Sequence, residues 1–229
     1  MRTWIKVAVT AAVLGGVLVG ADRIALSMAQ SRAADELAGR QGISGRPSVA
    51  IDDFPFLTDL IDKKLGSVHL SAAQMQLTGG GRSFQLQDFS AQLNGVQVDD
   101  GLRSATVDSG HGSGRISYQE VQSLMGLDAR TSIAYGGPGQ LKVGYEVLGQ
   151  RITTTVKLRT QGNQVLVAGV GDLPGVGALP GVSGMVSSAI GSKSFTLQGL
   201  PVGLNLDQVA PQPDGLQLSF QGSKVHLVG

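Results

Sequence analysis

The chain has 229 residues, enough for one domain of about 150 to 200 residues and an appendage. Its 18 basic and 17 acidic residues nearly balance, which argues against a nucleic-acid-binding protein that neutralises many phosphates. The absence of cysteine excludes disulfides, thiolate catalysis, iron–sulfur clusters and cysteine-based zinc sites. An exported protein without disulfides is more typical of bacteria than of animal secretory pathways.

The N-terminus carries a membrane-targeting pattern. Arg2 and Lys6 precede an apolar run over residues 7–21, and Asp22 ends the run. This pattern indicates a signal peptide or a membrane anchor within residues 1–22, with the rest of the chain outside the cytoplasm. The small residues before Asp22 would suit cleavage, whereas the apolar spacing that continues beyond it favours a retained anchor. Both alternatives stay open.

Two helical segments are predicted before the main run of strands. Residues 23–46 contain helix formers that give way to glycines and a proline, which predicts a juxtamembrane helix followed by a loop. Residues 58–65 keep apolar side chains at helical spacing and predict a short amphipathic helix. A third helix is expected over residues 117–127, where Ser117 and Glu120 form a capping box.

Most of residues 47–229 is predicted to form one β-rich domain. From Ser67 onward apolar and polar residues alternate with a period of two, which gives each strand one apolar and one polar face. Tight hairpin turns are expected at Gly149-Gln150 and at Gly162-Asn163. The apolar stretch from Leu173 to Ile190 is too rich in glycine and proline to cross a membrane, and we interpret it as a buried helix or loop.

The sequence shows no catalytic or metal-binding constellation. The three histidines, His69, His111 and His226, are far apart in sequence, and acidic pairs such as Asp52-Asp53 lack the alternating oxygens of a calcium loop. The segment Gly110–Gly114 (Gly-His-Gly-Ser-Gly) departs from the Gly-x-Ser-x-Gly nucleophile motif and is predicted to be a flexible turn. We therefore expect no cofactor, no metal and no enzymatic activity.

Residues 47–65 carry a resemblance to a known family. They read Pro-Ser-Val-Ala-Ile-Asp-Asp-Phe-Pro-Phe-Leu-Thr-Asp-Leu-Ile-Asp-Lys-Lys-Leu and follow an apolar segment and a helix. This segment resembles the signature of the LmeA-like family of actinobacterial cell-envelope phospholipid-binding proteins, and the similarity extends from about Ala21 to the C-terminus. The resemblance implies non-enzymatic phospholipid binding, a link to lipoglycan maintenance, and a fold similar to tubular lipid-binding (BPI-like) domains.

The combined prediction is an α+β, β-rich fold in which a long curved antiparallel sheet wraps around one or two helices and leaves an apolar groove for phospholipid acyl chains. The protein would act at the extracytoplasmic face of the plasma membrane, held or exported by its N-terminal segment, with no nucleic-acid partner. Phe56→Asp would then abolish lipid retention and leave the sheet intact. The predicted walls of the groove and the head-group contacts are these: Phe54, Phe56, Leu57, Leu60, Ile61 and Leu65 on one side; Val176, Leu179, Val182, Met185, Val186 and Ile190 on the other; Lys63 and Lys64 at the phosphate.

Two alternatives remain from the sequence. The same alternating strands could build a solid core of a scaffolding envelope domain that binds protein partners through its sheet edges. An enzyme of envelope lipid or glycan metabolism would need distant Asp, His or Ser side chains to converge in the fold.

Overall fold

A computed structural model gives the fold for residues 2–38, 43–44, 46–79, 81–98, 104–147, 150–170, 193–198, 200 and 202–228. Its helices are α1 (Arg2–Ala38), α2 (Phe56–Ile61) and α3 (Tyr118–Leu124). The strands are β1 (Ile43–Ser44), β2 (Ser48–Ile51), β3 (Lys64–Gly79), β4 (Arg82–Val98), β5 (Ser104–Ile116), β6 (Thr131–Tyr135), β7 (Gln140–Val147), β8 (Gln150–Gln161), β9 (Gln164–Val170), β10 (Ser194–Gln198), β11 (Val202–Gln212) and β12 (Gly215–Val228).

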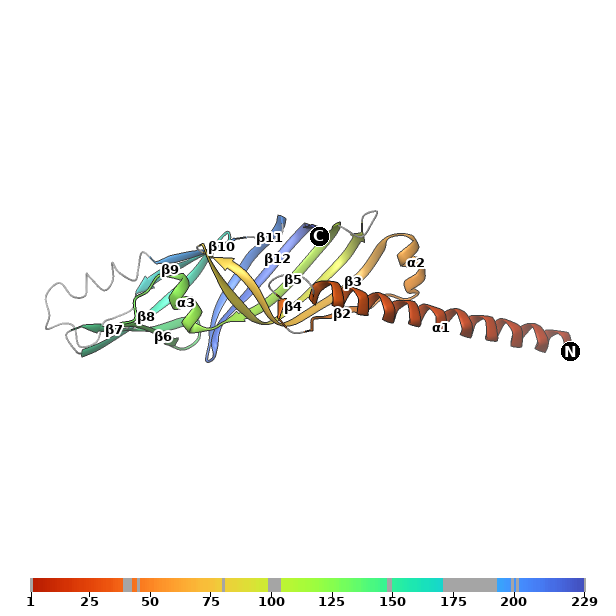
Figure 1. The fold of residues 1–229 in the computed structure, drawn as a ribbon, viewed down its shortest axis with the longest axis horizontal. Coiled ribbons are helices and arrows are strands. Elements are labelled where there is room, and N and C mark those ends of the chain that lie inside the picture. Colours follow the sequence, from red (N-terminus) through yellow and green to blue (C-terminus); the bar gives the residue numbers. More distant parts are fainter. Residues whose placement is uncertain are drawn as a thin grey trace.

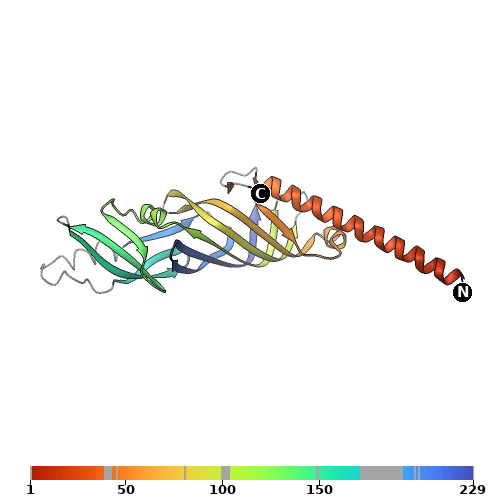
Figure 2. The same ribbon diagram turned by 90° about the horizontal axis from the view of Figure 1, so that it is seen from below.

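The molecule is elongated, and α1 projects from one end (Figure 1). The long strands β3, β4, β5 and β12 cross its middle, while α3 and strands β6 to β9 lie at the end opposite α1 (Figures 1 and 2). Helix α1 is continuous from Arg2 to Ala38, so one helix joins the predicted anchor to the predicted juxtamembrane helix.

The strands form one nearly closed antiparallel sheet wrapped around the N-terminal helix, which confirms the predicted fold class. The strand order is β11-β12-β5-β4-β3-β10-β9-β8-β7-β6. One edge of β3 pairs with β4 along its length, and its other edge is shared in turn by β2, β1 and β10. A 16-residue strand is long enough to hold three short partners, and this arrangement links the two halves of the sheet.

The two ends of the strand order approach each other through side chains of the β8–β9 region. The Asn163 amide oxygen accepts a hydrogen bond from the Leu206 backbone N–H of β11 at 2.9 Å. The Thr160 hydroxyl donates to the backbone carbonyl of Asp207 at 3.2 Å. These contacts tie β11 to the β8–β9 hairpin, whose predicted turn at Gly162-Asn163 is confirmed because Gln161 pairs with Gln164.

The apolar side of the sheet holds two separate clusters of buried side chains. The first, the distal core, lies between the long strands, α3 and strands β6 to β10, and includes Leu86, Ile116 and Phe195. The second, the helix core, packs Leu26 and Ala34 of α1 against residues of the long strands such as Val68 and Val107. Burial of an aliphatic side chain contributes about 1.5 to 3 kcal/mol, so both clusters stabilise the fold.

The prediction of a flexible turn at Gly110–Gly114 is wrong, because these residues lie inside β5. A Cβ atom at Gly114 would lie 2.5 Å from Leu86 Cγ, and one at Gly110 would lie 3.0 Å from a Leu93 methyl group. Glycine therefore lets side chains of β4 lie over the neighbouring strand. The close approach of packed side chains, rather than flexibility, accounts for the glycine pattern.

The predicted start of the short helix α3 agrees with the structure, whereas the predicted bounds of α2 do not. The Ser117 hydroxyl accepts a hydrogen bond from the Glu120 backbone N–H at 3.3 Å, which confirms Ser117 as the N-cap of α3. The Glu120 carboxylate accepts from the Ser117 hydroxyl and the Gln85 N–H. The helix predicted over residues 58–65 is instead Phe56–Ile61, and β3 begins at Lys64. Phe56, the first residue of α2, packs in the helix core, which explains the earlier start.

Candidate lipid-binding surface

Helix α2 is fastened to α1 at Asp22, the first acidic residue after the apolar run. The buried Asp22 carboxylate accepts a hydrogen bond from the Leu57 backbone N–H at 2.8 Å and pairs with Arg23 at 3.1 Å. The Arg23 guanidinium also donates to the Asp53 carbonyl at 3.3 Å and lies 4.8 Å from the centre of the Phe54 ring. An acceptor at the first turn of a helix satisfies a backbone N–H that has no partner within the helix.

The residues predicted for the first wall of the groove fall into two groups. Phe56 is 1% exposed in the helix core, and Leu57 and Leu65 are half-buried. Phe54, Leu60 and Ile61 instead face solvent, with exposures of 63%, 47% and 79%. The burial of Phe56 means that Phe56→Asp is expected to disrupt the fold, contrary to the expectation from the sequence.

The remaining predicted contacts have different outcomes. The whole second wall lies outside the described residues: Val176, Leu179, Val182, Met185, Val186 and Ile190. Lys63 and Lys64 are exposed where α2 leads into β3, and the Lys63 carbonyl accepts a hydrogen bond from the Val98 N–H at 3.0 Å. Their role at a head-group phosphate stays a prediction.

A strip of half-buried apolar residues lies on the inner face of the sheet, the face that α1 covers. We call this set the inner strip, and its members are Leu70, Ala91, Leu93, Gly112 and Leu204. Directly paired residues point to the same face, so Leu70, Ala91 and Gly112 form one row across β3, β4 and β5. Leu204 packs against both the helix core and the distal core, which places the strip at their junction.

Small residues make the inner strip shallow. Ala91 and Gly112 are cross-strand partners, and a Cβ atom at Gly112 would lie only 3.3 Å from that of Ala91. The row therefore carries little side-chain volume at Ala91 and Gly112. The half-buried Leu70 lies on one side of this pair, and the buried Phe220, the other partner of Gly112, lies on the other. An acyl chain that covers this half-buried apolar surface would remove it from water, which favours binding.

The outer face of the same strands bears a groove of about 600 Å³. Two rows of mainly polar residues cross it, and cross-strand pairing aligns them. The rows are Ala50, His69, Gln92, His111 and Gln221, and beside them Ser48, Ser71, Ser90, Ser113 and Ser219. Between the two rows the groove also borders Leu70, Ala91, Gly112 and Phe220, a row that contains three members of the inner strip.

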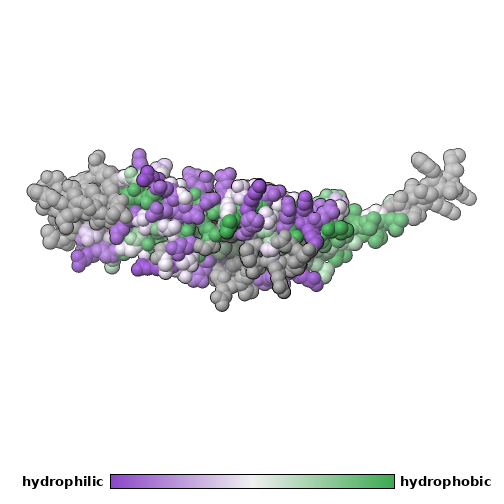
Figure 3. Space-filling view, turned by 90° about the horizontal axis from the view of Figure 1, so that it is seen from above, coloured by the Kyte–Doolittle hydropathy of each residue, from purple (hydrophilic) through white to green (hydrophobic). Residues whose placement is uncertain are grey.

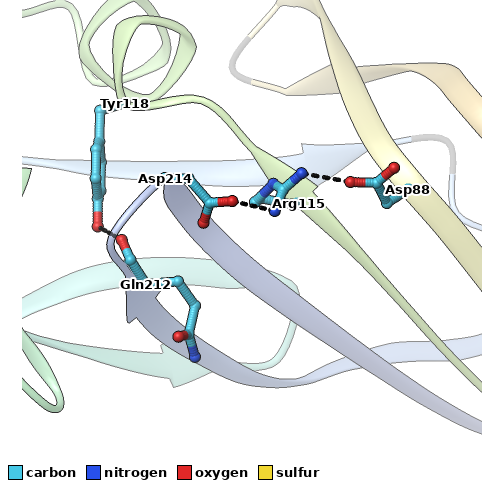
Figure 4. A network of polar contacts seen from close by, with 5 residues as sticks. All are labelled: Asp88, Arg115, Tyr118, Gln212 and Asp214. Atoms are coloured by element: carbon cyan, nitrogen blue, oxygen red, sulfur yellow. Dashed lines mark hydrogen bonds and ion pairs between the residues drawn. The ribbon is translucent and has the colours of Figure 1, made fainter.

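A polar network fixes the far end of the long strands (Figure 4). The Arg115 guanidinium of β5 pairs with Asp88, at a bulge in β4, and with Asp214 in the β11–β12 turn. The Tyr118 hydroxyl of α3 donates a hydrogen bond to the Gln212 carbonyl. Burial, together with the negative charge of Asp214, raises the pKa of the Tyr118 phenol above its ordinary value. The network joins three strands and a helix.

Among the described residues, the other polar side chains form isolated pairs. His69 pairs with the exposed Asp52 at 2.8 Å, and His226 lies 3.3 Å from the Thr106 hydroxyl at a strand end. Within the part of the chain that the structure describes, no group of three or more His, Cys, Asp or Glu residues could hold a metal ion. Glu120, one of the few glutamates, caps α3 and accepts from the Gln85 N–H at 2.7 Å.

Helix α1 has the length of a membrane span. Its segment Ala12–Ala38 is long and apolar enough to cross a membrane by length and composition. The exposed apolar side chains in its first half include Val13, Val17 and Leu18, and Figure 3 shows hydrophobic surface along the projecting helix.

Comparison with known proteins supplies the family. No curated protein and no solved structure matches the chain. The sequence profile of the LmeA-like phospholipid-binding family matches residues 20–221, from the end of the apolar run to the middle of β12. The match includes the joint between α1 and α2, the inner strip, the distal core and all buried members of the helix core except Val225. The chain therefore belongs to the LmeA-like phospholipid-binding family.

Proposed function

We propose that this protein binds phospholipid without catalysis in a bacterial cell envelope, where it acts as a carrier, chaperone or sensor for envelope lipid or lipoglycan maintenance. The acyl chains lie along the inner strip, and the head group stays near solvent. The observation that carries the proposal is the half-buried apolar row at the junction of the two cores, in a chain of a phospholipid-binding family.

The energetics of acyl-chain burial support this proposal. Each methylene group removed from water contributes about 0.8 kcal/mol, so even part of two acyl chains would offset the loss of translational freedom on binding. The sheet side supplies the apolar contacts through Leu70, Leu93 and Leu204, and the small Ala91 and Gly112 leave room for the ligand.

The proposed topology follows from the charges that flank the apolar run. Arg2 and Lys6 precede the run and favour the cytoplasmic side, so α1 crosses the plasma membrane and the sheet lies on its extracytoplasmic side. Asp22 is both the first charged residue after the run and the carboxylate that holds α2. Retention of α1 as an anchor therefore preserves the joint on which α2 depends.

Native mass spectrometry of the full chain, extracted from bacterial membranes in detergent, tests the proposed function. After exchange into a second detergent, we expect a phospholipid adduct near one lipid per protein. Organic extraction then identifies the lipid. A lipid-free mass, together with no uptake from added liposomes, would reject phospholipid binding and favour a scaffolding domain with a solid core.

A further inference from the structure

Three apolar side chains form an exposed cluster at α2. These are Phe54, Leu60 and Ile61, which we call the α2 tip, and Ile61 is the most exposed of them at 79%. The neighbouring Phe56 and Leu57 are buried or half-buried, whereas Leu60, Ile61 and the Phe54 ring, which also contacts Arg23, are exposed to solvent. Adjacent exposed large apolar residues mark a surface that contacts another molecule or a membrane.

The α2 tip is fixed to α1 rather than carried on an independent loop. Asp22 of α1 accepts the Leu57 N–H bond, and Arg23 holds the Asp53 carbonyl and lies over the Phe54 ring. Two consecutive α1 residues thus determine where α2 lies along that helix. Figures 1 and 2 both show α2 beside α1 at the end of the sheet from which the helix projects.

The point of attachment coincides with the expected end of the membrane span. Residues 2–21 of a helix that rises about 1.5 Å per residue cover about 30 Å, the thickness of a bilayer hydrocarbon core. No charged residue occurs between Lys6 and Asp22. A bilayer crossed by this segment therefore has its outer interface at the level of Asp22, which is where α2 is bound.

We propose that the α2 tip inserts into the outer interface of the bilayer that α1 crosses. This inference rests on the anchoring step of the proposed function, and its occupant is the lipid surface of that same membrane. The insertion gives the domain a second attachment beside α1 and therefore fixes its orientation. Because β3 begins at Lys64, three residues after Ile61, the sheet that carries the inner strip starts at the lipid surface.

Apolar contact, rather than net charge, drives this attachment. The segment carries Lys63 and Lys64 but also Asp59 and Asp62, so its basic and acidic residues balance. Amphipathic segments with aromatic and aliphatic side chains bind at the headgroup boundary through buried apolar area. Insertion is therefore expected in vesicles of neutral phosphatidylcholine, without anionic lipid.

The chain is suited to a labelling experiment because it has no native cysteine. Ile61→Cys in the full chain would carry an environment-sensitive nitrobenzoxadiazole dye, and the protein would be reconstituted into phosphatidylcholine vesicles. Ser123→Cys is the matched control, because Ser123 is an exposed residue in the last turn of α3, the other short helix, at the far end of the molecule. Circular dichroism checks that both labelled chains keep their sheet.

The two labels are expected to report different surroundings. Dye at position 61 should show blue-shifted emission and at least a twofold loss of intensity with nitroxide-labelled lipid, while dye at position 123 should show neither effect. Emission at position 61 that matches position 123, in protein that floats with the vesicles, would overturn the insertion of the α2 tip and leave the anchor intact. Failure of the unlabelled chain to float would overturn both the anchor and this inference.

Discussion

Replacing Phe56 by alanine is expected to lower the free energy of unfolding by about 3 to 5 kcal/mol, the range for a buried aromatic side chain. Phe56 is 1% exposed and packs in the helix core with residues of α1 and the long strands. Its removal leaves a cavity at the joint that holds α2 against α1. Denaturant unfolding of the full chain in mild detergent, followed by circular dichroism of the sheet, measures the loss.

Phe54→Ala is the matched control, because the same side chain is removed two residues away. Phe54 is 63% exposed, and its contact with Arg23 is a cation–π pair, so the expected loss is at most about 1 kcal/mol. Similar losses for the two variants would mean that the helix core does not depend on Phe56. The same outcome would return Phe56 to the candidates for direct lipid contact.

Ala91→Trp is expected to reduce co-purified phospholipid at least tenfold while the sheet remains folded. Ala91 is half-buried at the centre of the inner strip, and its partner Gly112 has no side chain to displace. An indole ring at position 91 can therefore lie over Gly112 and cover the surface proposed for an acyl chain, as an aromatic side chain does beside a strand glycine. Lipid phosphate per mole of protein after organic extraction measures the effect.

Gln92→Trp provides the control for added bulk in the same strand. Successive residues of a strand point to opposite faces, so Gln92 lies in the outer row with its cross-strand partners His69 and His111. Its replacement is expected to leave the lipid content within about twofold of the unmodified chain. Equal loss of lipid in both variants would indicate a general disturbance of β4. Unchanged lipid content in Ala91→Trp would contradict the proposal that acyl chains lie along the inner strip.

The sequence predicts local structure well where a short pattern determines it. Ser117 caps α3 as expected, because the N-cap bond to the Glu120 N–H joins residues only three apart. Alternation in β3 and β4 likewise predicts their apolar faces, since a period of two leaves one face toward the core. The family resemblance carried by residues 47–65 is confirmed by the family match over residues 20–221.

Features that depend on distant contacts could not be predicted in the same way. The glycines of β5 resemble a flexible turn in sequence, and only the neighbouring side chains of Leu86 and Leu93 show why a strand needs them. Phe54 and Phe56 are both aromatic residues of one motif, yet α1 packs over the second and leaves the first exposed. The inner strip combines residues from β3, β4, β5 and β11, which no linear pattern joins.

Photo-crosslinking with a phospholipid that carries a diazirine in its acyl chain tests most directly where the lipid lies. The full chain in phosphatidylcholine vesicles is irradiated, digested and analysed by mass spectrometry. We predict labelled peptides from β3 and β4 that contain Leu70, Ala91 or Leu93, in addition to labels on the membrane span. Labels confined to residues 2–21 and α2 would contradict this prediction, because only lipid of the surrounding bilayer would then touch the protein.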